Sequence, residues 1–158
     1  MDKFLDTPAL ESLVDLMRTN KQSIVFTNGC FDLLHPGHMD YLQKAKTLGD
    51  VLIVALNSDD SVRQIKGESR PVNSLNDRMA MLAALECVDF VTSFQEDTPY
   101  NLIDAIKPDI LVKGGDYTKD EIVGADIVED NGGEVKILDF LPGYSSSDLI
   151  KRIQKLNE

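Results

Sequence analysis

Residues 23–38 have the sequence SIVFTNGCFDLLHPGH, and this stretch decides the fold class. Residues 23–27 are mostly apolar and β-branched or aromatic, which predicts a short buried strand. A loop containing Gly29 follows, and then a helix from about Pro36 to Leu48, because proline is favoured in the first turn of a helix. A buried strand that leads into a helix is the opening half of a parallel strand–helix–strand unit.

The same alternation of strand and helix continues to the end of the chain. It predicts further strands over 50–56, 88–92, 109–113 and 134–138, and helices over about 8–19, from 59, over 74–86 and 98–106, from 118, and over 145–156. Helical crossovers between strands imply a right-handed, parallel arrangement with helices on both faces. We therefore expect a doubly wound, five-stranded parallel α/β sheet of Rossmann-like type, in one domain spanning residues 1–158.

The two terminal helices carry specific expectations. The N-terminal helix is expected to pack on the core and to cover an edge of the sheet. The last helix is amphipathic, and its apolar side chains are expected to face inward: Leu149, Ile150, Ile153 and Leu156.

Length and composition set the broad class of protein. The chain has 158 residues, 42% of them hydrophobic and 27% charged, which suits one soluble domain. A formal net charge of −11 argues against non-specific binding to nucleic acid or to an anionic membrane. The two cysteines are far apart, and neither a signal peptide nor a membrane span is evident, so we expect reduced thiols and a cytoplasmic protein.

Both histidines of the chain lie within four residues of each other, directly after the first strand. With Pro36 starting a helix and Gly37 leaving room, His35 and His38 suggest an anion site at a helix N-terminus, where unpaired N–H groups and the helix dipole favour negative charge. The dipole should also lower the pKa of a histidine there, which leaves a neutral imidazole that donates to phosphate. Two alternatives stay open: the pair only packs or caps, or Cys30, His35 and His38 hold a metal.

These residues also resemble a known family. Gly29-Cys30-Phe31-Asp32 followed by His35-Pro36-Gly37-His38 resembles the GxFDxxHxGH signature of the nucleotidyltransferases that include cytidylyltransferases, whereas the GxxxxGK[ST] and GxGxxG patterns are absent. Four further segments resemble the adenylyltransferases that make ADP-heptose from D-glycero-β-D-manno-heptose 1-phosphate: residues 66–73, 82–89, 96–99 and 111–117. The resemblance runs from about residue 23 to residue 153.

The resemblance implies a reaction and a set of partners. AMP would pass from ATP to a sugar 1-phosphate with release of pyrophosphate, without a covalent enzyme intermediate and with Mg²⁺ held mainly by the ATP phosphates. In many bacteria this unit is fused to a sugar kinase, so a separate sugar kinase is expected in the same pathway. The resemblance also implies a homodimer or a higher homo-oligomer.

It further implies roles for individual residues. The expected catalytic residues are His35, His38, Lys66 and Lys113. The expected nucleotide-binding residues are Thr27, Asn28, Gly29, Cys30, Phe31, Gly37, Ser145, Ser146 and Ser147, and the expected substrate-binding residues are Asp32, Asn57, Arg70, Gly114 and Asp116.

Plainer interpretations accompany several of these roles. The cations Lys66, Arg70 and Lys113 are also typical of a solvated surface, and the serines are typical of a helix N-cap. Asp32 either holds its loop through backbone N–H groups, which we favour, or recruits Mg²⁺. For Arg78 a position on a helix face is favoured over a functional role.

Two other functions remain as alternatives. One is a cytidylyltransferase acting on glycerol 3-phosphate or another small phosphate, because the histidine signature does not select the base and residues 139–144 are expected to do so. The other is a nucleotide sensor or subunit without catalysis. The retained histidines and lysines argue against a sensor, which has no need to bind a transition state.

Overall fold

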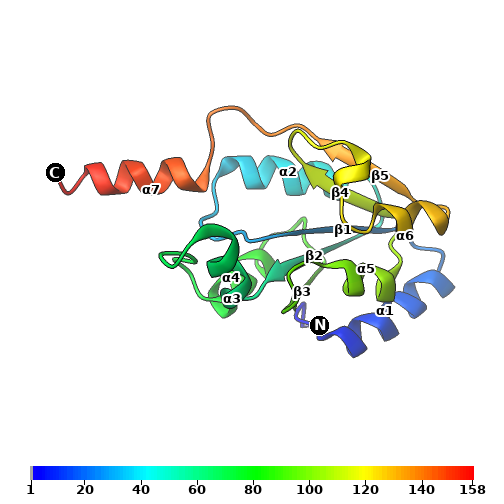
Figure 1. Cartoon of the computed structure of the whole chain (residues 1–158). Coiled ribbons are helices and arrows are strands. Elements are labelled where there is room, and N and C mark those ends of the chain that lie inside the picture. The colour runs from blue at the N-terminus through cyan, green and yellow to red at the C-terminus, as the bar shows by residue number, and fades with distance from the viewer. Residues whose placement is uncertain (1) are drawn as a thin grey trace.

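The computed structural model describes residues 2–158 (Figure 1). Its strands are β1 (Ile24–Gly29), β2 (Val51–Asn57), β3 (Phe90–Phe94), β4 (Ile110–Gly114) and β5 (Glu134–Leu138). Its helices are α1 (Thr7–Thr19), α2 (Pro36–Lys46), α3 (Asp59–Lys66), α4 (Leu75–Ala83), α5 (Tyr100–Ile106), α6 (Ala125–Asp130) and α7 (Ser146–Lys155), with a 3₁₀ turn η1 (Lys119–Glu121).

The five strands form one parallel sheet in the order β3-β2-β1-β4-β5. Strand β1 is central, with Val25 in register with Leu52 of β2 and with Ile110 of β4. The predicted doubly wound, parallel, five-stranded fold is confirmed. The chain runs outward from β1 to β3 and then crosses to β4, so the strand order reverses between β1 and β4. In such sheets, ligands bind beyond the carboxyl ends of the strands at this point.

Side chains that alternate along the strands build a core on each face. On one face, Ile24 and Phe26 of β1 pack with residues of α1, α5 and α6. On the other, Val25 packs with residues of α2 and α4. The successive apolar residues of β1 and β2 are therefore all buried, as expected for a parallel sheet covered on both sides (Figure 1).

Some element boundaries differ from the prediction. Strand β3 begins at Phe90, two residues later than expected. The helix expected from Thr118 is only a 3₁₀ turn with a capping box between Thr118 and Glu121. The longer helix of this region, α6, was not predicted, because it begins only after Gly124, which adopts the left-handed conformation at φ +85°.

The N-terminal region covers the sheet differently from the prediction. Helix α1 packs on a face, where Leu10 and Val14 are fully buried. The edge of β3 is covered instead by the segment before the helix, because the Val91 N–H donates to the Lys3 carbonyl at 2.8 Å and the Leu5 N–H donates to the Val91 carbonyl at 3.1 Å. An extended segment can complete a strand ladder, which a helix cannot.

Helix α7 contradicts the inward packing expected for its apolar residues. It projects from the body of the molecule (Figure 1) and has no buried residue. Ile153 is 50% exposed and Leu156 is 84% exposed, while Leu149 and Ile150 are partly exposed. Periodicity identifies the apolar face of a helix and leaves open what covers that face. Along residues 2–158, no helix combines the length and apolar character that crossing a membrane requires.

Candidate active site

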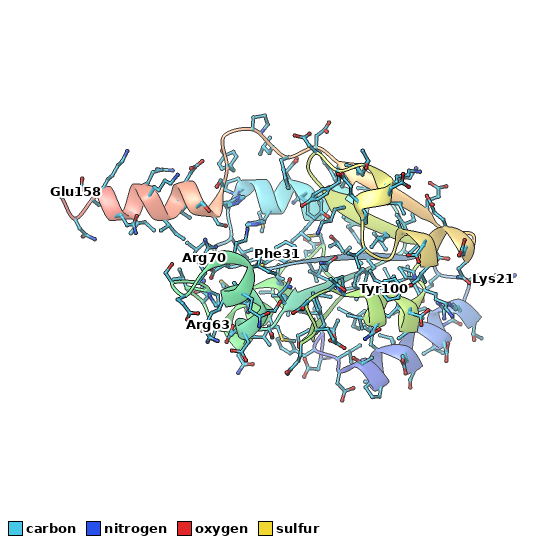
Figure 2. All side chains as sticks on the ribbon, in the orientation of Figure 1. Lys21, Phe31, Arg63, Arg70, Tyr100 and Glu158 are labelled. Atoms are coloured by element: carbon cyan, nitrogen blue, oxygen red, sulfur yellow. The ribbon has the colours of Figure 1, made fainter. Side chains whose placement is uncertain are left out.

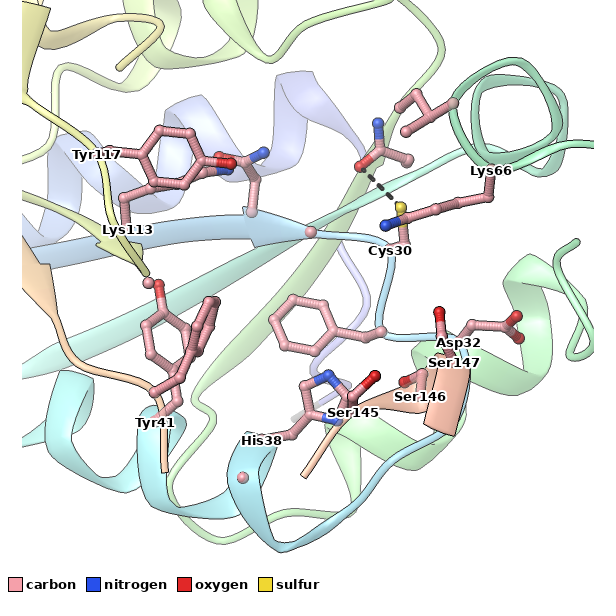
Figure 3. Close-up of a pocket in the computed structure, with 18 of the residues that line it drawn as sticks. Cys30, Asp32, His38, Tyr41, Lys66, Lys113, Tyr117, Ser145, Ser146 and Ser147 are labelled. Atoms are coloured by element: carbon pink, nitrogen blue, oxygen red, sulfur yellow. Dashed lines mark hydrogen bonds between the residues drawn. The ribbon is translucent and has the colours of Figure 1, made fainter. Parts of the chain in front are cut away.

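A cavity of about 720 Å³ opens beyond the carboxyl ends of β1 and β4, where the strand order reverses. It is lined by most of the residues predicted for the site: Asn28, Gly29, Cys30, Phe31, Asp32, His35, Gly37, His38, Asn57, Lys66, Arg70, Lys113, Gly114, Ser145, Ser146 and Ser147 (Figure 3). Two predicted residues, Thr27 and Asp116, are not among the lining residues. The fold thus gathers residues from the ends of β1, β2 and β4, from the loops that follow the strands and from the start of α7.

The two histidines sit at the first turn of α2. His35 is the N-cap residue, and His38 is the third residue of the helix. Their rings are stacked, with centroids 3.8 Å apart. The Nδ1 of His38 accepts a hydrogen bond from the His35 N–H at 3.3 Å, so the proton of a neutral His38 lies on Nε2. A side chain at Gly37 would come within 3.0 Å of the His35 ring, which explains why glycine stands between the histidines.

Both histidines are neutral near pH 7. Burial, together with the neighbouring His35, lowers the pKa of His38 to about 4. Burial alone lowers the pKa of His35. The direction agrees with the expectation, but desolvation rather than the helix dipole is its main cause. A neutral His38 with its proton on Nε2 is a hydrogen-bond donor that adds no full charge to the pocket.

The loop that carries the histidines is braced by a buried carboxylate. Asp32 is fully buried and accepts hydrogen bonds from the N–H groups of Val72 and Asn73 and from Nε of Arg70 at 2.6 Å. Burial alone would raise the pKa of Asp32, but these donors outweigh it and hold the pKa below its ordinary value. Asp32 therefore joins two loops of the site, in agreement with the favoured interpretation, although its backbone donors belong to the second loop.

A second brace is Arg78 of α4, whose side chain is completely buried. Its guanidinium donates to the Cys30 carbonyl at 2.8 Å, to the Asn73 carbonyl at 3.2 Å and to the Asp59 carboxylate at 2.7 Å. The helix-face position favoured from the sequence is wrong, because the arginine turns inward and connects the histidine loop, the Asn73 loop and the start of α3.

Two lysines reach the cavity from other elements. Lys66 ends α3 and points toward Cys30, whose sulfur is 4.0 Å from Oδ1 of Asn57 (Figure 3). Lys113 ends β4 and lies 5.6 Å from the centre of the Tyr117 ring. Burial lowers the pKa of the Lys113 ammonium. An anion bound beside it would favour its charged form.

Thr27 and Tyr41 form a buried support behind the cavity. The hydroxyls of Thr27 and Tyr41 are 2.6 Å apart and lie 3.0 Å and 3.2 Å from the Val112 carbonyl oxygen, so one hydroxyl donates to the other, which in turn donates to the carbonyl. Burial raises the pKa of Tyr41 to about 12, so this phenol remains neutral. Thr27 is fully buried and ties β1 to β4, which accounts for its absence from the cavity lining.

The C-terminal segment closes one side of the cavity. The Ser146 hydroxyl donates to the Leu33 carbonyl at 2.8 Å, and the Ser145 hydroxyl caps α7 by accepting from the Asp148 N–H at 3.3 Å. Phe140 packs closely over Gly114 and Gly115, where a Cβ would come within 2.6 Å and 2.7 Å of its ring. Gly114 therefore also serves a packing contact.

Several lining residues were missing from the predicted set. They are chiefly aromatic or apolar side chains: Tyr41, Ile65, Tyr117, Ile122, Val123, Phe140 and Leu141. Isolated apolar residues carry no chemical pattern in a sequence. The glycine pair before Tyr117 was the one available signal, because adjacent glycines at a strand end permit close packing by a ring.

The structure offers no support for a metal site made of Cys30, His35 and His38. Their side chains do not form a ligand cluster, and residues 2–158 contain no group of three or more histidine, cysteine, aspartate or glutamate side chains that could hold a metal ion. The Nδ1 of His38 is already used by the His35 N–H. A divalent cation in this cavity would need ligands from its substrate.

Known proteins share both the sequence and the fold. Bifunctional protein HldE of Histophilus somni (strain 129Pt) is 54% identical over 98% of this chain and 32% of its own length. HldE of Helicobacter hepaticus (strain ATCC 51449 / 3B1) is 57% identical over 92% of this chain and 30% of its own length. The chain thus spans about a third of the length of these curated relatives.

Solved structures agree. The lipopolysaccharide core biosynthesis protein from Thermoplasma volcanium GSS1 is 30% identical with a TM-score of 0.61, covering 76% of this chain and 97% of that one. Pantoate-beta-alanine ligase from Francisella tularensis, in complex with beta-gamma ATP and beta-alanine, shares the fold alone, at 18% identity, a TM-score of 0.65 and coverage of 98% of this chain and 77% of that one. A family model described as cytidylyltransferase-like matches residues 26–152. This chain belongs to the cytidylyltransferase-like family.

Proposed function

We propose that this protein transfers AMP from ATP to D-glycero-β-D-manno-heptose 1-phosphate, giving ADP-heptose and pyrophosphate. An oxygen of the sugar phosphate attacks the α-phosphorus of ATP, and the bond from that phosphorus to the bridging oxygen of the β-phosphate breaks. Pyrophosphate leaves with the electron pair of this bond. The reaction requires alignment of two polyanions and neutralisation of the charge around the α-phosphate, and no covalent enzyme intermediate.

The observation that carries the proposal is the state of His38. It is neutral, has its proton on Nε2, lines the cavity and stands in the first turn of a helix. Such a group donates a hydrogen bond to a phosphate oxygen whose charge increases in the transition state. His35 is stacked on it and lines the same cavity.

Lys66 and Lys113 would hold anionic oxygens from two other sides of the cavity. They belong to α3 and β4, and so come from elements other than the histidine loop. Within residues 2–158, neither ammonium has a carboxylate within 4.0 Å, so both are available to phosphates. On a chain with a formal net charge of −11, such local cations are needed to admit two polyanionic substrates.

The remaining site residues divide into contact and positioning roles. We assign nucleotide contacts to the main chain of residues 28–31 and to Ser147, with Asn57 and Gly114 toward the acceptor. Asp32 and Arg70 act by holding the loops, and Ser145 and Ser146 hold the start of α7. Mg²⁺ would enter bound to the ATP phosphates and would offset their charge, because the residues of the cavity do not build a carboxylate cluster for it.

The choice of acceptor rests on similarity. HldE relatives match nearly the whole chain at 54–57% identity, and a solved relative is named as a lipopolysaccharide core biosynthesis protein. The segments 66–73, 82–89, 96–99 and 111–117 support the same substrate. Because the HldE relatives are bifunctional and about three times longer, a separate sugar kinase that supplies the sugar phosphate belongs to the proposal. So do a cytoplasmic location and self-association as a homodimer or a higher homo-oligomer.

Pyrophosphate release tests this function directly. The protein is incubated with Mg²⁺ and heptose 1-phosphate, once with ATP and once with CTP, and glycerol 3-phosphate replaces the heptose in parallel samples. We expect turnover with ATP and heptose 1-phosphate. Turnover with CTP alone would overturn the assignment of the base, and ATP binding without any product would indicate a sensor.

A further inference from the structure

Helix α7 presents an apolar row that nothing in the described chain covers. Leu149, Ile153 and Leu156 follow one another at intervals of four and three residues, which places them along one face of the helix. The body holds the helix chiefly at its start, through the Ser146 hydroxyl. A shallow hollow runs along the same face between these side chains. This row is the apolar stripe that the inward packing of the helix was expected to bury.

A helix in this position needs a partner. Isolated helices shorter than about 12–15 residues are marginal in water, and α7 has 10 residues. Its stability must therefore come from burying the apolar row. The body of the same chain does not cover the apolar row, because α7 points away from it (Figure 1).

The charges of α7 select the partner. Asp148, Arg152 and Lys155 form a second row beside the apolar one, with the same spacing of four and three residues. The row is negative at its start and positive at its end. Two such rows are complementary only in antiparallel order, in which each Asp148 faces the Lys155 of the other copy. In parallel order the charged rows of the two helices would lie on opposite sides of the shared apolar seam, so they would not face each other.

We propose that α7 pairs in antiparallel order with α7 of a second copy of this chain. The apolar rows then bury each other, two Asp148–Lys155 pairs flank them, and the opposed helix dipoles are favourable. The competing contact of Asp148 with Lys151 in the same helix, at 4.0 Å, is exposed and weak. The inference gives a surface to the self-association proposed above and rests on no catalytic role of any residue.

Pairing over the full helix has a geometric consequence. Ten residues of helix are about 15 Å long, so the tip of one α7 reaches the start of the other, beside the serines that line the cavity. The end of each α7 would therefore lie beside the start of its partner's α7, next to the opening of the partner's cavity. Because the helix pair is small compared with a typical stable interface, we expect association to depend on protein concentration.

The first test measures mass in solution. Sedimentation equilibrium of the full chain is expected to show a monomer–dimer equilibrium. Ile153→Glu should shift it to monomer, whereas Leu16→Glu, which charges an equally exposed apolar side chain of α1, should leave it unchanged. At concentrations where the parent chain is monomeric, thermal unfolding of both variants should match the parent chain, because neither side chain is buried within one copy. A chain that is monomeric at every soluble concentration overturns the proposal, as does one that is monomeric alone and binds a sugar kinase through α7.

The second test exchanges charges. Asp148→Lys or Lys155→Asp alone should weaken the dimer about threefold to tenfold, while the double variant should restore it, because antiparallel order faces these two positions. The proposed α7 surface is wrong if the double variant does not restore the dimer. It is also wrong if dimerisation is unchanged in every α7 variant, even though the chain then self-associates through another surface. Pyrophosphate release is measured in a separate assay. The sedimentation results on α7 therefore remain valid even if the proposed adenylyltransferase function is wrong.

Discussion

The histidine loop, residues 28–38, and the C-terminal segment, residues 139–158, line the same cavity but are held very differently. Two arginines from other parts of the chain fix the first: Arg78 of α4 donates to the Cys30 carbonyl, and Arg70 donates to the buried carboxylate of Asp32. The second is joined to the histidine loop through one side-chain hydrogen bond, from Ser146 to Leu33, and its helix has no buried residue. The comparison shows that buried polar contacts hold the histidine loop in place, whereas the C-terminal wall of the cavity is held by fewer contacts.

Removing the deepest brace should have the largest effect. Arg78→Met leaves the Cys30 and Asn73 carbonyls and the Asp59 carboxylate without their donor, and we expect a loss of about 3–5 kcal/mol in the free energy of unfolding. Urea denaturation measures it. The matched control is Arg63→Met on exposed α3, expected within about 0.5 kcal/mol of the parent chain. A similar loss for both arginines would mean that the histidine loop is not specially braced.

Removing a proposed donor should lower catalysis without affecting the fold. His38→Ala deletes the Nε2 proton from the cavity, and kcat should fall by about 10²–10³-fold. Steady-state pyrophosphate release gives the rate, and urea denaturation confirms that the protein is folded. A decrease of less than tenfold in a folded variant would reduce His38 to a packing residue.

The cation at the end of β4 should affect binding more than turnover. Lys113→Gln removes a charge from the cavity, and the KM for ATP or for the sugar phosphate should rise about tenfold, equivalent to about 1.4 kcal/mol. Lys21→Gln serves as the control, because Lys21 lies at the far end of the molecule from Phe31 and Arg70 (Figure 2). Equal effects of the two substitutions would show that general surface charge, and not this site, controls affinity.

Cutting the tether of the C-terminal segment should have a smaller effect. Ser146→Ala removes the hydrogen bond to Leu33, with a net value of about 0.5–1.5 kcal/mol. Hydrogen exchange should accelerate over residues 139–158 while global unfolding stays unchanged. Ser12→Ala deletes a comparable hydroxyl bond within α1 and should leave that exchange as it is. Unchanged hydrogen exchange over residues 139–158 in the Ser146 variant would show that other contacts hold the segment.

Varying the pH should have the smallest effect on catalysis. With a pKa of about 4, His38 stays neutral from pH 8 to pH 6, whereas an ordinary histidine would be about three-quarters protonated at pH 6. A histidine titration in log kcat near pH 6.5 would contradict this. Because the folded-state pKa lies below the ordinary value, His38 stabilises the fold above pH 6.5, and this contribution is lost as the pH falls from 6.5 toward 4. His38→Gln should reduce that loss.

The sequence predicts the two regions to different extents, for physical reasons. Local patterns located β1, β5 and the start of α2, because apolar runs and a proline after the N-cap act within a few residues. The short helix α6 was missed, since its start depends on the left-handed Gly124. Most of the predicted site residues line the cavity, whereas Thr27 and Asp116 lie outside the lining and the polar lining residues Asp97, Thr98 and Glu121 were not predicted.

What sequence reasoning missed depends on distant contacts. Arg78 belongs to a helix whose pattern gives no sign that its guanidinium reaches Cys30, 48 residues away. Tyr41 and Phe140 enter the cavity because β4 and its glycines lie beside them. For α7, periodicity identified the apolar face correctly, but the spacing of the apolar residues alone does not identify the partner that we propose for it. Such partners require knowledge of the packed fold.

The pairing of residues 3–5 with β3 has a consequence for solubility. An open sheet has two outer strands whose unpaired N–H and C=O groups can recruit strands from other molecules. The N-terminal segment occupies these groups around Val91 on one side. On the other, β5 carries the charged side chains Glu134 and Lys136, which discourage stacking by foreign strands. The protein thus protects both margins of its sheet from aggregation, and deletion of the first five residues should promote precipitation before it alters the active site.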